Sequence, residues 1–431
     1  MPPYSLFNVG PLRIICTPAA TNVVYAGIAM DVGTRDELPT ESGMAHLVEH
    51  MTFKGTRQRS SLQILNRMES VGADLNAFTG KEETIYYSVF LKEHLARAID
   101  LLTDIVFHST YPQAELEKEV EVVCDEIESY NDSPAELIYD DIESLLFPGH
   151  PLGRNILGDA ERLHQYTSAH LQAFTQRLYH PARAVLFVQG QVDPEQVRHL
   201  VEKAMLPYVT EAEANPAPSA GRGIHANSPA ACLDIQPDGR TVVGQHSSGL
   251  SVVRHKPVHQ AHVMIGTTAY PFTHPLYMAQ ALLNNMLGGP GLNSRLALSL
   301  RERRGLVYTV ESNLTAYTDT TVWSVYLGCD PADVKRCLRL VQKELERLAA
   351  APLPARTLNA AKRQMKGQLG VSYDNFESVA IGAAKRYLHY GTTISPAQFF
   401  AQIDAITSSE LHQVATTLFQ PERLTTLIYT N

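Results

Sequence analysis

The order of the predicted secondary-structure elements repeats along the chain, and this repeat constrains the fold more than any other feature. In the first half, strands at residues 12–17 and 23–32 precede a helix at 42–53, for which Ser42 is the expected N-cap. In the second half, a strand at 261–268 precedes a helix at 275–287. The repeat is one of element order and not of sequence identity. We therefore predict an α+β fold of two structurally similar domains, a tandem duplication, each an antiparallel-rich sheet packed with helices.

The remaining elements support two domains of this kind. The stretch 207–238 is rich in Ala, Pro, Glu, Ser and Gly and has little periodicity, as is typical of a linker. We expect an N-terminal domain at 1–210, a linker at 211–240 and a C-terminal domain at 241–431. The other predicted elements are a hairpin of 73–79 and 84–91, helices at 61–71, 93–107, 112–130 and 333–348, and strands at 184–188 and 321–327.

Composition excludes several classes of protein and partner. A chain of 431 residues with 44% hydrophobic and 19% charged residues is not mainly disordered, collagen-like or coiled-coil. Acidic residues outnumber basic ones, 45 to 36, and no basic block stands out, so we expect no nucleic-acid partner. No run approaches the roughly 18 apolar residues of a membrane helix, so we expect no membrane partner.

The five cysteines form no Cys-x-x-Cys pair. With no secretory signal in view, a cytoplasmic location is expected, or a periplasmic one if a leader has been removed.

One short motif carries the chemistry. His46 and His50 are one helical turn apart, so their imidazoles share a face and can chelate one metal ion. Glu49 lies toward the same face and can reach a water molecule at that ion without being a ligand itself. The alternative is that two surface histidines merely lie beside a glutamate.

A catalytic zinc usually has three protein ligands, and the third is often a carboxylate. The helix that begins near Pro112 offers several glutamates, of which Glu119 and Glu126 are two turns apart on one face. An apolar stripe near that face indicates that Glu126 points inward. The alternative is an acidic helix that simply faces solvent, as we expect of Glu117, Glu121 and Glu128.

The motif is the inverse of the usual zincin order, and its surroundings resemble a known family. The chain is similar to the pitrilysin-type inverzincin metallopeptidases, and within them to a short-chain bacterial branch that resembles mitochondrial processing peptidase. The stretches that carry the resemblance are GTRDE (33–37), GMAHLVEHMTFKGT (43–56), GADLNAFT (72–79), EVEVVCDEI (119–127) and HPLGRNILG (150–158).

The resemblance assigns roles to these residues. It implies that His46, His50 and Glu126 bind Zn²⁺, that Glu49 is the catalytic base, and that Glu119 supports the site as part of the catalytic group. It also implies that the strand containing Asn76, Ala77 and Phe78 binds substrate by pairing with an extended peptide. Without the resemblance, Asn76 would be taken merely as the end of a strand.

The second half supplies a further pair of expected catalytic residues. Arg301 and Tyr308 have the spacing of an Arg/Tyr pair that, in the family, holds substrate and donates hydrogen bonds to the carbonyl oxygen as it gains charge. The alternatives are an exposed helix cation and a core aromatic. The nearby glycines match no nucleotide-binding pattern.

The resemblance also implies how the chain works. We expect a zinc metalloendopeptidase that hydrolyses peptides or unfolded segments in a chamber formed by two chains, with the zinc half from one chain and the Arg/Tyr half from the other. Since the chain carries both halves, we expect a homodimer, with a heterodimer with a related subunit as the variant. Two other functions stay open: a non-catalytic partner or structural subunit of a heterodimeric processing peptidase, and a peptide-binding or chaperone-like module.

Overall fold

The structure, a computed structural model, describes residues 4–214, 233–235, 241–243 and 249–431. The chain divides into two compact units. Unit 1 comprises Met1–Glu128, Arg154–Gly223 and Val371–Pro396, and unit 2 comprises Ser129–Gly153, Ile224–Gly370 and Ala397–Asn431. Each unit is therefore built mainly from one half of the chain but includes a segment from the other half.

Unit 1 contains a six-stranded sheet in the order β1-β2-β6-β3-β5-β4. Neighbouring strands are antiparallel except β2 and β6, which are parallel. The edges of the sheet are β1 and β4. The strands are β1 (Ser5–Val9), β2 (Leu12–Pro18), β3 (Val23–Met30), β4 (Asp74–Thr79), β5 (Thr84–Leu91) and β6 (Ala184–Gly190).

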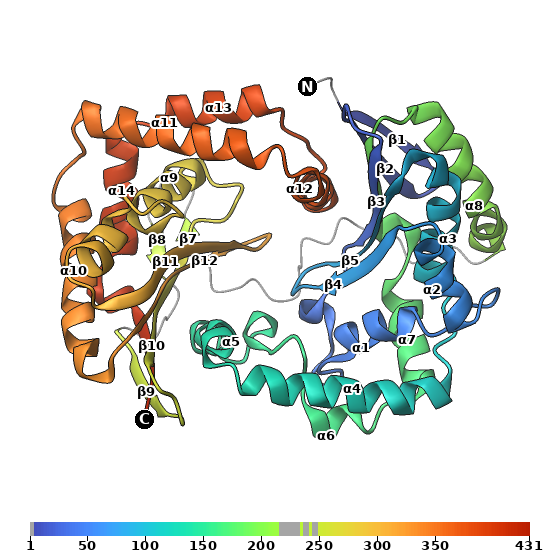
Figure 1. The fold of residues 1–431 in the computed structure, drawn as a ribbon, viewed down its shortest axis with the longest axis horizontal. Coiled ribbons are helices and arrows are strands. Elements are labelled where there is room, and N and C mark those ends of the chain that lie inside the picture. Colours follow the sequence, from blue (N-terminus) through green and yellow to red (C-terminus); the bar gives the residue numbers. More distant parts are fainter. Residues whose placement is uncertain (1–3, 215–232, 236–240, 244–248) are drawn as a thin grey trace. The chain divides into compact units, whose positions relative to one another are not determined.

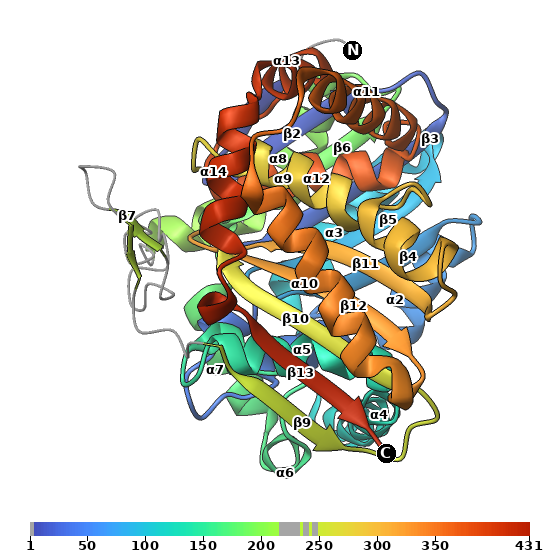
Figure 2. The same ribbon diagram turned by 90° about the vertical axis from the view of Figure 1, so that its left-hand side faces the viewer.

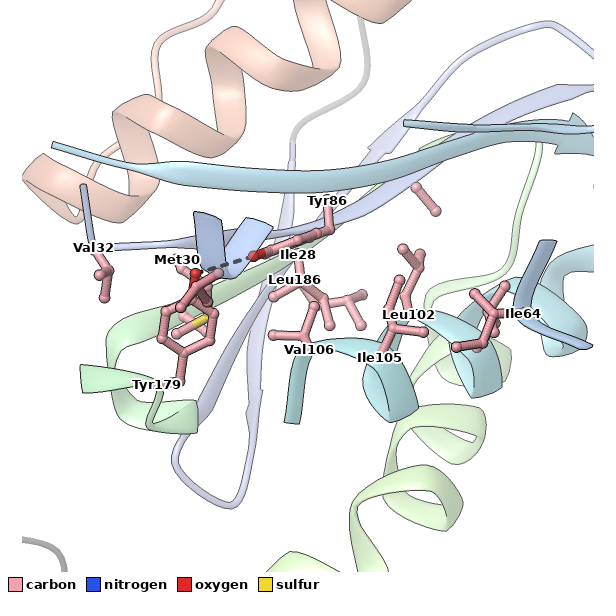
Figure 3. Packing of buried hydrophobic residues seen from close by; sticks show 14 of the residues in the cluster. Ile28, Met30, Val32, Ile64, Tyr86, Leu102, Ile105, Val106, Tyr179 and Leu186 are labelled. Carbon is pink, nitrogen blue, oxygen red and sulfur yellow. Dashed lines mark hydrogen bonds between the residues drawn. The ribbon is translucent and has the colours of Figure 1, made fainter. Parts of the chain in front are cut away.

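Both faces of this sheet are buried, because successive side chains alternate between two apolar layers. Ile14 and Ile28 pack into the main core with the helices, whereas their neighbours Ile15 and Ala29 pack against α12 (Phe376–Tyr390). Figure 3 shows part of the main core, where side chains of β3, β5 and β6 meet those of α3. The helices that contribute to this core are α1 (Met44–Thr52), α2 (Ser61–Glu69), α3 (Leu95–His108), α4 (Gln113–Asn131), α6 (Ala160–Leu163), α7 (Ser168–Leu178) and α8 (Pro194–Ala214).

Unit 2 repeats this topology. Its five-stranded sheet has the order β11-β12-β10-β13-β9, and only β13 and β9 are parallel. Figure 2 shows these strands side by side. The same order, β4-β5-β3-β6-β2, runs through unit 1, so the predicted α+β fold with two similar domains is confirmed. The strands are β9 (Ser251–His255), β10 (Ala261–Ala269), β11 (Val307–Ala316), β12 (Thr321–Cys329) and β13 (Thr425–Thr430), and β7 (Leu233–Ile235) pairs separately with β8 (Thr241–Val243).

The sheet of unit 2 is also covered on both faces. Val263 and Val325 face the core formed with the main helices, whereas Met264 packs with Ile138 and Ile142 of α5 (Pro134–Leu146). Among the described residues, no helix combines the length and apolarity that crossing a membrane requires. The main helices are α9 (Tyr277–Gly288), α10 (Val334–Ala350), α11 (Ala355–Ser372), α13 (Pro396–Ala405) and α14 (Ser408–Leu418).

The units exchange one helical segment each, and this differs from the contiguous domains expected from the sequence. Ser129–Gly153, with α5, belongs to unit 2, and Val371–Pro396, with α12, belongs to unit 1 (Figure 1). The physical reason is that each sheet has a second apolar face, and the helix that buries it comes from the other half of the chain. Most of the expected linker at 211–240 lies outside the described residues, although α8 extends to Ala214.

Candidate metal centre

The helix α1 holds the motif in a buried position. Leu47, Val48 and Met51 are fully buried in the core of unit 1, which fixes the face that His46 and His50 share. The two imidazole rings lie edge to face with their centroids 4.5 Å apart. The arrangement therefore has the geometry of two ligands on consecutive turns of one helix.

The start of α1 is fixed by a glycine and a distant carboxylate. The helix begins after Gly43 and not after the expected cap Ser42. Gly43 has a φ of 79°, and an added Cβ would lie 2.7 Å from the carbonyl oxygen of Leu157, so this position favours glycine. The buried Glu37 accepts hydrogen bonds from the backbone N–H groups of Gly43 (3.3 Å) and Ala45 (2.9 Å). Burial raises the pKa of Glu37 to about 8, although these hydrogen bonds oppose the shift.

Glu126 of α4 lies next to both imidazoles. Its Oε2 atom is 3.8 Å from Nε2 of His46 and 3.6 Å from Nε2 of His50. Tetrahedral zinc with bonds of about 2.0–2.1 Å separates its ligand atoms by about 3.3–3.4 Å, so the three side chains fit such an ion with small adjustments. Within the described part of the chain, one group of three or more histidine, cysteine, aspartate or glutamate side chains is close enough together to hold a metal ion. That group is His46, His50 and Glu126.

Glu119 supports His50 from the side away from Glu126. Its Oε1 atom is 3.0 Å from Nδ1 of His50, and its Oε2 atom is 2.5 Å from Nζ of Lys54. A carboxylate that accepts a hydrogen bond from Nδ1–H keeps the proton on Nδ1 and leaves the lone pair of Nε2 available for a metal ion. The carboxylate is thus positioned to orient the imidazole.

Burial and neighbouring charges shift the pKa values of these groups in different directions. Burial and the neighbouring His50 lower the pKa of His46 to about 3, so this imidazole is neutral near pH 7. Burial lowers the pKa of His50, but Glu119 and the other nearby carboxylates outweigh it and raise the net value. Burial raises the pKa of Glu119, whereas hydrogen bonds from His50 and Lys54 reverse this and lower it overall.

Glu49 lies beside this group and is largely buried. Thr79, the last residue of β4, donates a hydrogen bond from Oγ1 to Oε2 of Glu49 at 2.6 Å. Burial raises the pKa of Glu49 and the nearby Glu126 adds to this, while Thr79 and His50 act in the opposite direction. A carboxylate with a raised pKa near a metal site is suited to accept and release a proton near neutral pH.

The predicted substrate strand is an edge strand whose end reaches the site. Asn76, Ala77 and Phe78 lie in β4, which pairs with β5 on one side, and Asn76 is exposed. Such an edge can pair with an extended peptide. The hydrogen bond from Thr79 to Glu49 brings the end of this edge to the predicted base.

Arg301 and Tyr308 both lie in unit 2. Arg301 is in the π-helix η5 (Ala297–Glu302) and lines a cavity of about 280 Å³ with the glycine-rich segment 288–291 and residues 310–313 of β11. Tyr308 is the extra residue of a β-bulge in β11, and 78% of it is exposed. Bulges commonly redirect a side chain near an active site. Tyr308 is therefore not a core aromatic.

The structure also shows which details of the motif region the sequence does not reveal. Glu117, Glu121 and Glu128 are exposed as expected, and Val122 of the same helix is also exposed, at 51%. Lys54, Thr79 and Glu37 contribute to the site and were missed. The spacing of Lys54 from His50, one helical turn, is a signal that could have identified it, whereas the contacts of Thr79 and Glu37 depend on tertiary packing.

Comparison with known proteins places the chain in a family. The family model described as "Insulinase (Peptidase family M16)" matches residues 14–160, and the one described as "Peptidase M16 inactive domain" matches residues 165–365. The first match contains the metal-ligand group. The second matches most of unit 2. There the helix α9, which follows β10 as α1 follows β3 in unit 1, has no histidine, cysteine, aspartate or glutamate.

Individual relatives extend over nearly the whole chain. An uncharacterized zinc protease of Bacillus subtilis, YmxG, is 30% identical over 405 residues, which is 94% of this chain and 92% of the relative. An uncharacterized zinc protease of Mycobacterium tuberculosis is 32% identical over 409 residues, which is 94% of this chain and 88% of the relative.

Solved structures share the fold. The crystal structure of a protease from Helicobacter pylori has a TM-score of 0.86 at 21% identity and covers all of both chains. A peptidase M16 inactive domain from Pseudomonas fluorescens has a TM-score of 0.81 at 19% identity, covering 99% of this chain and 98% of that one. The resemblance to the mitochondrial-processing-peptidase branch stays a prediction. The family matches and the full-length relatives show that this chain belongs to peptidase family M16, the pitrilysin-type insulinase family.

Proposed function

We propose that the protein is a zinc-dependent endopeptidase that hydrolyses peptides or unfolded segments. The observation that carries this proposal is the convergence of His46, His50 and Glu126, with Glu49 beside them. The names of the relatives, zinc proteases, support zinc as the ion that these side chains hold. A zinc ion bound there would act as a Lewis acid, which polarises a carbonyl group and lowers the pKa of a bound water molecule toward neutral pH.

The remaining roles belong to side chains of the protein. Glu49 removes a proton from the attacking water and delivers it to the leaving amine. Glu119 fixes the orientation of His50 through the 3.0 Å contact at Nδ1. The edge strand β4, with Asn76, Ala77 and Phe78, holds the substrate backbone by main-chain hydrogen bonds, and this favours extended and unfolded substrates over folded ones.

Arg301 and Tyr308 are proposed to stabilise the negative charge that develops on the carbonyl oxygen of the substrate. Both side chains are accessible for this role, since 78% of Tyr308 and about half of the Arg301 side chain are exposed. We further propose that two copies of the chain form a homodimer around a chamber, in which one copy supplies the metal centre and the other supplies the Arg/Tyr pair. The mass of the purified protein in solution tests this arrangement, and a monomer that is fully active would contradict it.

The decisive experiment measures cleavage of a quenched fluorescent peptide library by the purified protein. We expect cleavage that a chelator abolishes and added zinc restores. Glu49→Gln is expected to keep its zinc and lose cleavage, because the amide cannot accept the proton. Full turnover by Glu49→Gln would remove Glu49 from the mechanism, and intact peptides with zinc-loaded wild type would favour a non-catalytic subunit or a peptide-binding module.

A further inference from the structure

The turn between β4 and β5 is unusual because its charged residues are buried. Lys81, Glu82 and Glu83 are 5%, 3% and 7% exposed. Hairpin turns normally lie at the surface with their charges in water, and a buried charge is costly unless it is paired. The position of this turn must therefore be fixed by specific partners.

One set of partners comes from the segment after β3. Arg35 forms a buried ion pair with Glu82 at 2.6 Å, and its backbone N–H donates to the carbonyl oxygen of Lys81 at 2.8 Å. The backbone of Gly33 packs so closely on the turn that an added Cβ would lie 2.5 Å from the carbonyl oxygen of Lys81. These contacts hold one side of the turn.

The other set of partners comes from α12, the helix that the second half of the chain contributes to unit 1. Glu83 pairs with Nε2 of His389 at 3.0 Å and with Nζ of Lys385. Nδ1 of His389 is 3.5 Å from Oδ1 of Asp31. Burial raises the pKa of Glu83, but His389 and Lys385 outweigh it and lower the pKa to about 2, so the carboxylate is ionised. We call Glu83, Lys385 and His389 the α12 cluster.

Thr79, the last residue of β4, directly precedes this turn. The N–H of Gly80, the first turn residue, donates to the carbonyl oxygen of Glu83 at 2.7 Å. From this position the hydroxyl of Thr79 reaches Glu49 at 2.6 Å. Glu83, the cluster member in the hairpin, is thus the last of the four turn residues 80–83, and Thr79, which contacts the base, directly precedes the first of them.

We propose that Thr79 is a positioning residue for Glu49, and that the α12 cluster holds the turn that places Thr79. This inference rests on the proposed peptidase function. The hydrogen bond from Thr79 fixes the rotation of the Glu49 carboxylate, and a base that is held in its productive orientation loses less entropy in the transition state. The second half of the chain thereby controls the orientation of a base that the first half supplies.

The first test removes the hydroxyl of Thr79 with little change of shape. Thr79→Val is expected to lower kcat on the order of 10–100-fold, with KM within about twofold and the zinc content unchanged. Thr79→Ser, which restores the hydroxyl, is expected to recover most of kcat. A Thr79→Val enzyme with the kcat of the wild type, or a Thr79→Ser enzyme as slow as Thr79→Val, would overturn the proposal.

The second test asks whether the α12 cluster acts through Thr79. Lys385→Met and His389→Gln are each expected to lower kcat while zinc stays bound. If the cluster acts by placing Thr79, adding either change to Thr79→Val will lower kcat little further, because the same contact is already lost. Independent, multiplying losses in the double variants would overturn this part, as would an unchanged kcat in the single variants. If His389→Gln fails to fold, Lys385→Met still provides the test.

One control variant tests whether the losses are specific. Lys366→Met removes an exposed ion pair with Asp404 (2.7 Å) in unit 2 and is expected to leave kcat unchanged. The wild type and Glu49→Gln separate this inference from the proposed function. If the zinc-loaded wild type cleaves no peptide, both proposals fall. If the wild type cleaves, Glu49→Gln does not, and Thr79→Val retains full kcat, only the positioning role falls.

Discussion

Replacing His389 by glutamine is expected to change the pH dependence of stability in a way that the structure allows us to calculate. His389 is a buried residue of α12 whose ring nitrogens face Glu83 and Asp31, with Lys385 bound to the same Glu83. Burial lowers the pKa of His389, but the two carboxylates outweigh it and raise the pKa to about 9 from an ordinary value of 6.5. The imidazolium form is therefore the one that the folded state stabilises.

A raised pKa of this size corresponds to a stabilisation on the order of 3 kcal/mol, at about 1.4 kcal/mol for each pH unit. Because the folded pKa is the higher one, this stabilisation is fully present below about pH 6.5 and is lost as the pH rises through about 9. The difference in free energy of unfolding between wild type and His389→Gln should therefore be about 3 kcal/mol larger at pH 6 than at pH 9.5.

Urea unfolding of both proteins at the two pH values measures this difference. Groups that do not contact residue 389 titrate alike in both proteins, so their contributions cancel in the comparison. The matched control is His412→Gln, which removes a histidine bonded to the carbonyl oxygen of Ala349 instead of to carboxylates. A gap between wild type and His389→Gln that is the same at pH 6 and pH 9.5 would refute the ionised cluster.

Three further changes test other parts of the account. Glu119→Gln should weaken zinc binding about 10–100-fold in a chelator competition assay, because the carboxylate that orients His50 loses its charge. The control Glu117→Gln, on the exposed face of the same helix, should bind zinc like the wild type. Equal zinc affinities of the two variants would contradict the role of Glu119. Tyr308→Phe should lower kcat about 10²-fold without loss of zinc, and an unchanged kcat would remove the hydroxyl from oxyanion stabilisation. Gly43→Ala should lower the melting temperature, because a φ of 79° is strained for alanine and its Cβ would meet backbone; an unchanged melting temperature would show that the cap relaxes freely.

Much of the fold was predictable because its elements are locally encoded. The hairpin of β4 and β5 and the strands β6 and β10 lie where alternation and turn residues placed them. The exchange of α5 and α12 was not predictable, because both faces of a strand such as β3 are apolar and the sequence does not state which helix covers each face. The repeat of element order does correspond to a repeat of strand order in the two sheets.

The candidate site was predictable to the extent that helix geometry encodes it. The spacing of His46 and His50 gives a shared face directly, and the position of Glu126 on α4 follows from its periodicity together with the family resemblance. The contact of Thr79 with Glu49 joins a strand end to a helix thirty residues earlier in the chain. No local pattern encodes such a contact, because it depends on how the hairpin turn is held.

The proposed peptidase function depends most directly on whether His46, His50 and Glu126 bind one zinc ion together. Metal analysis of the purified protein should find about one zinc per chain in wild type and in Glu49→Gln, and little in His50→Ala or Glu126→Ala, with peptide cleavage lost in all three variants. Zinc retained at the wild-type level in both ligand variants would contradict the account.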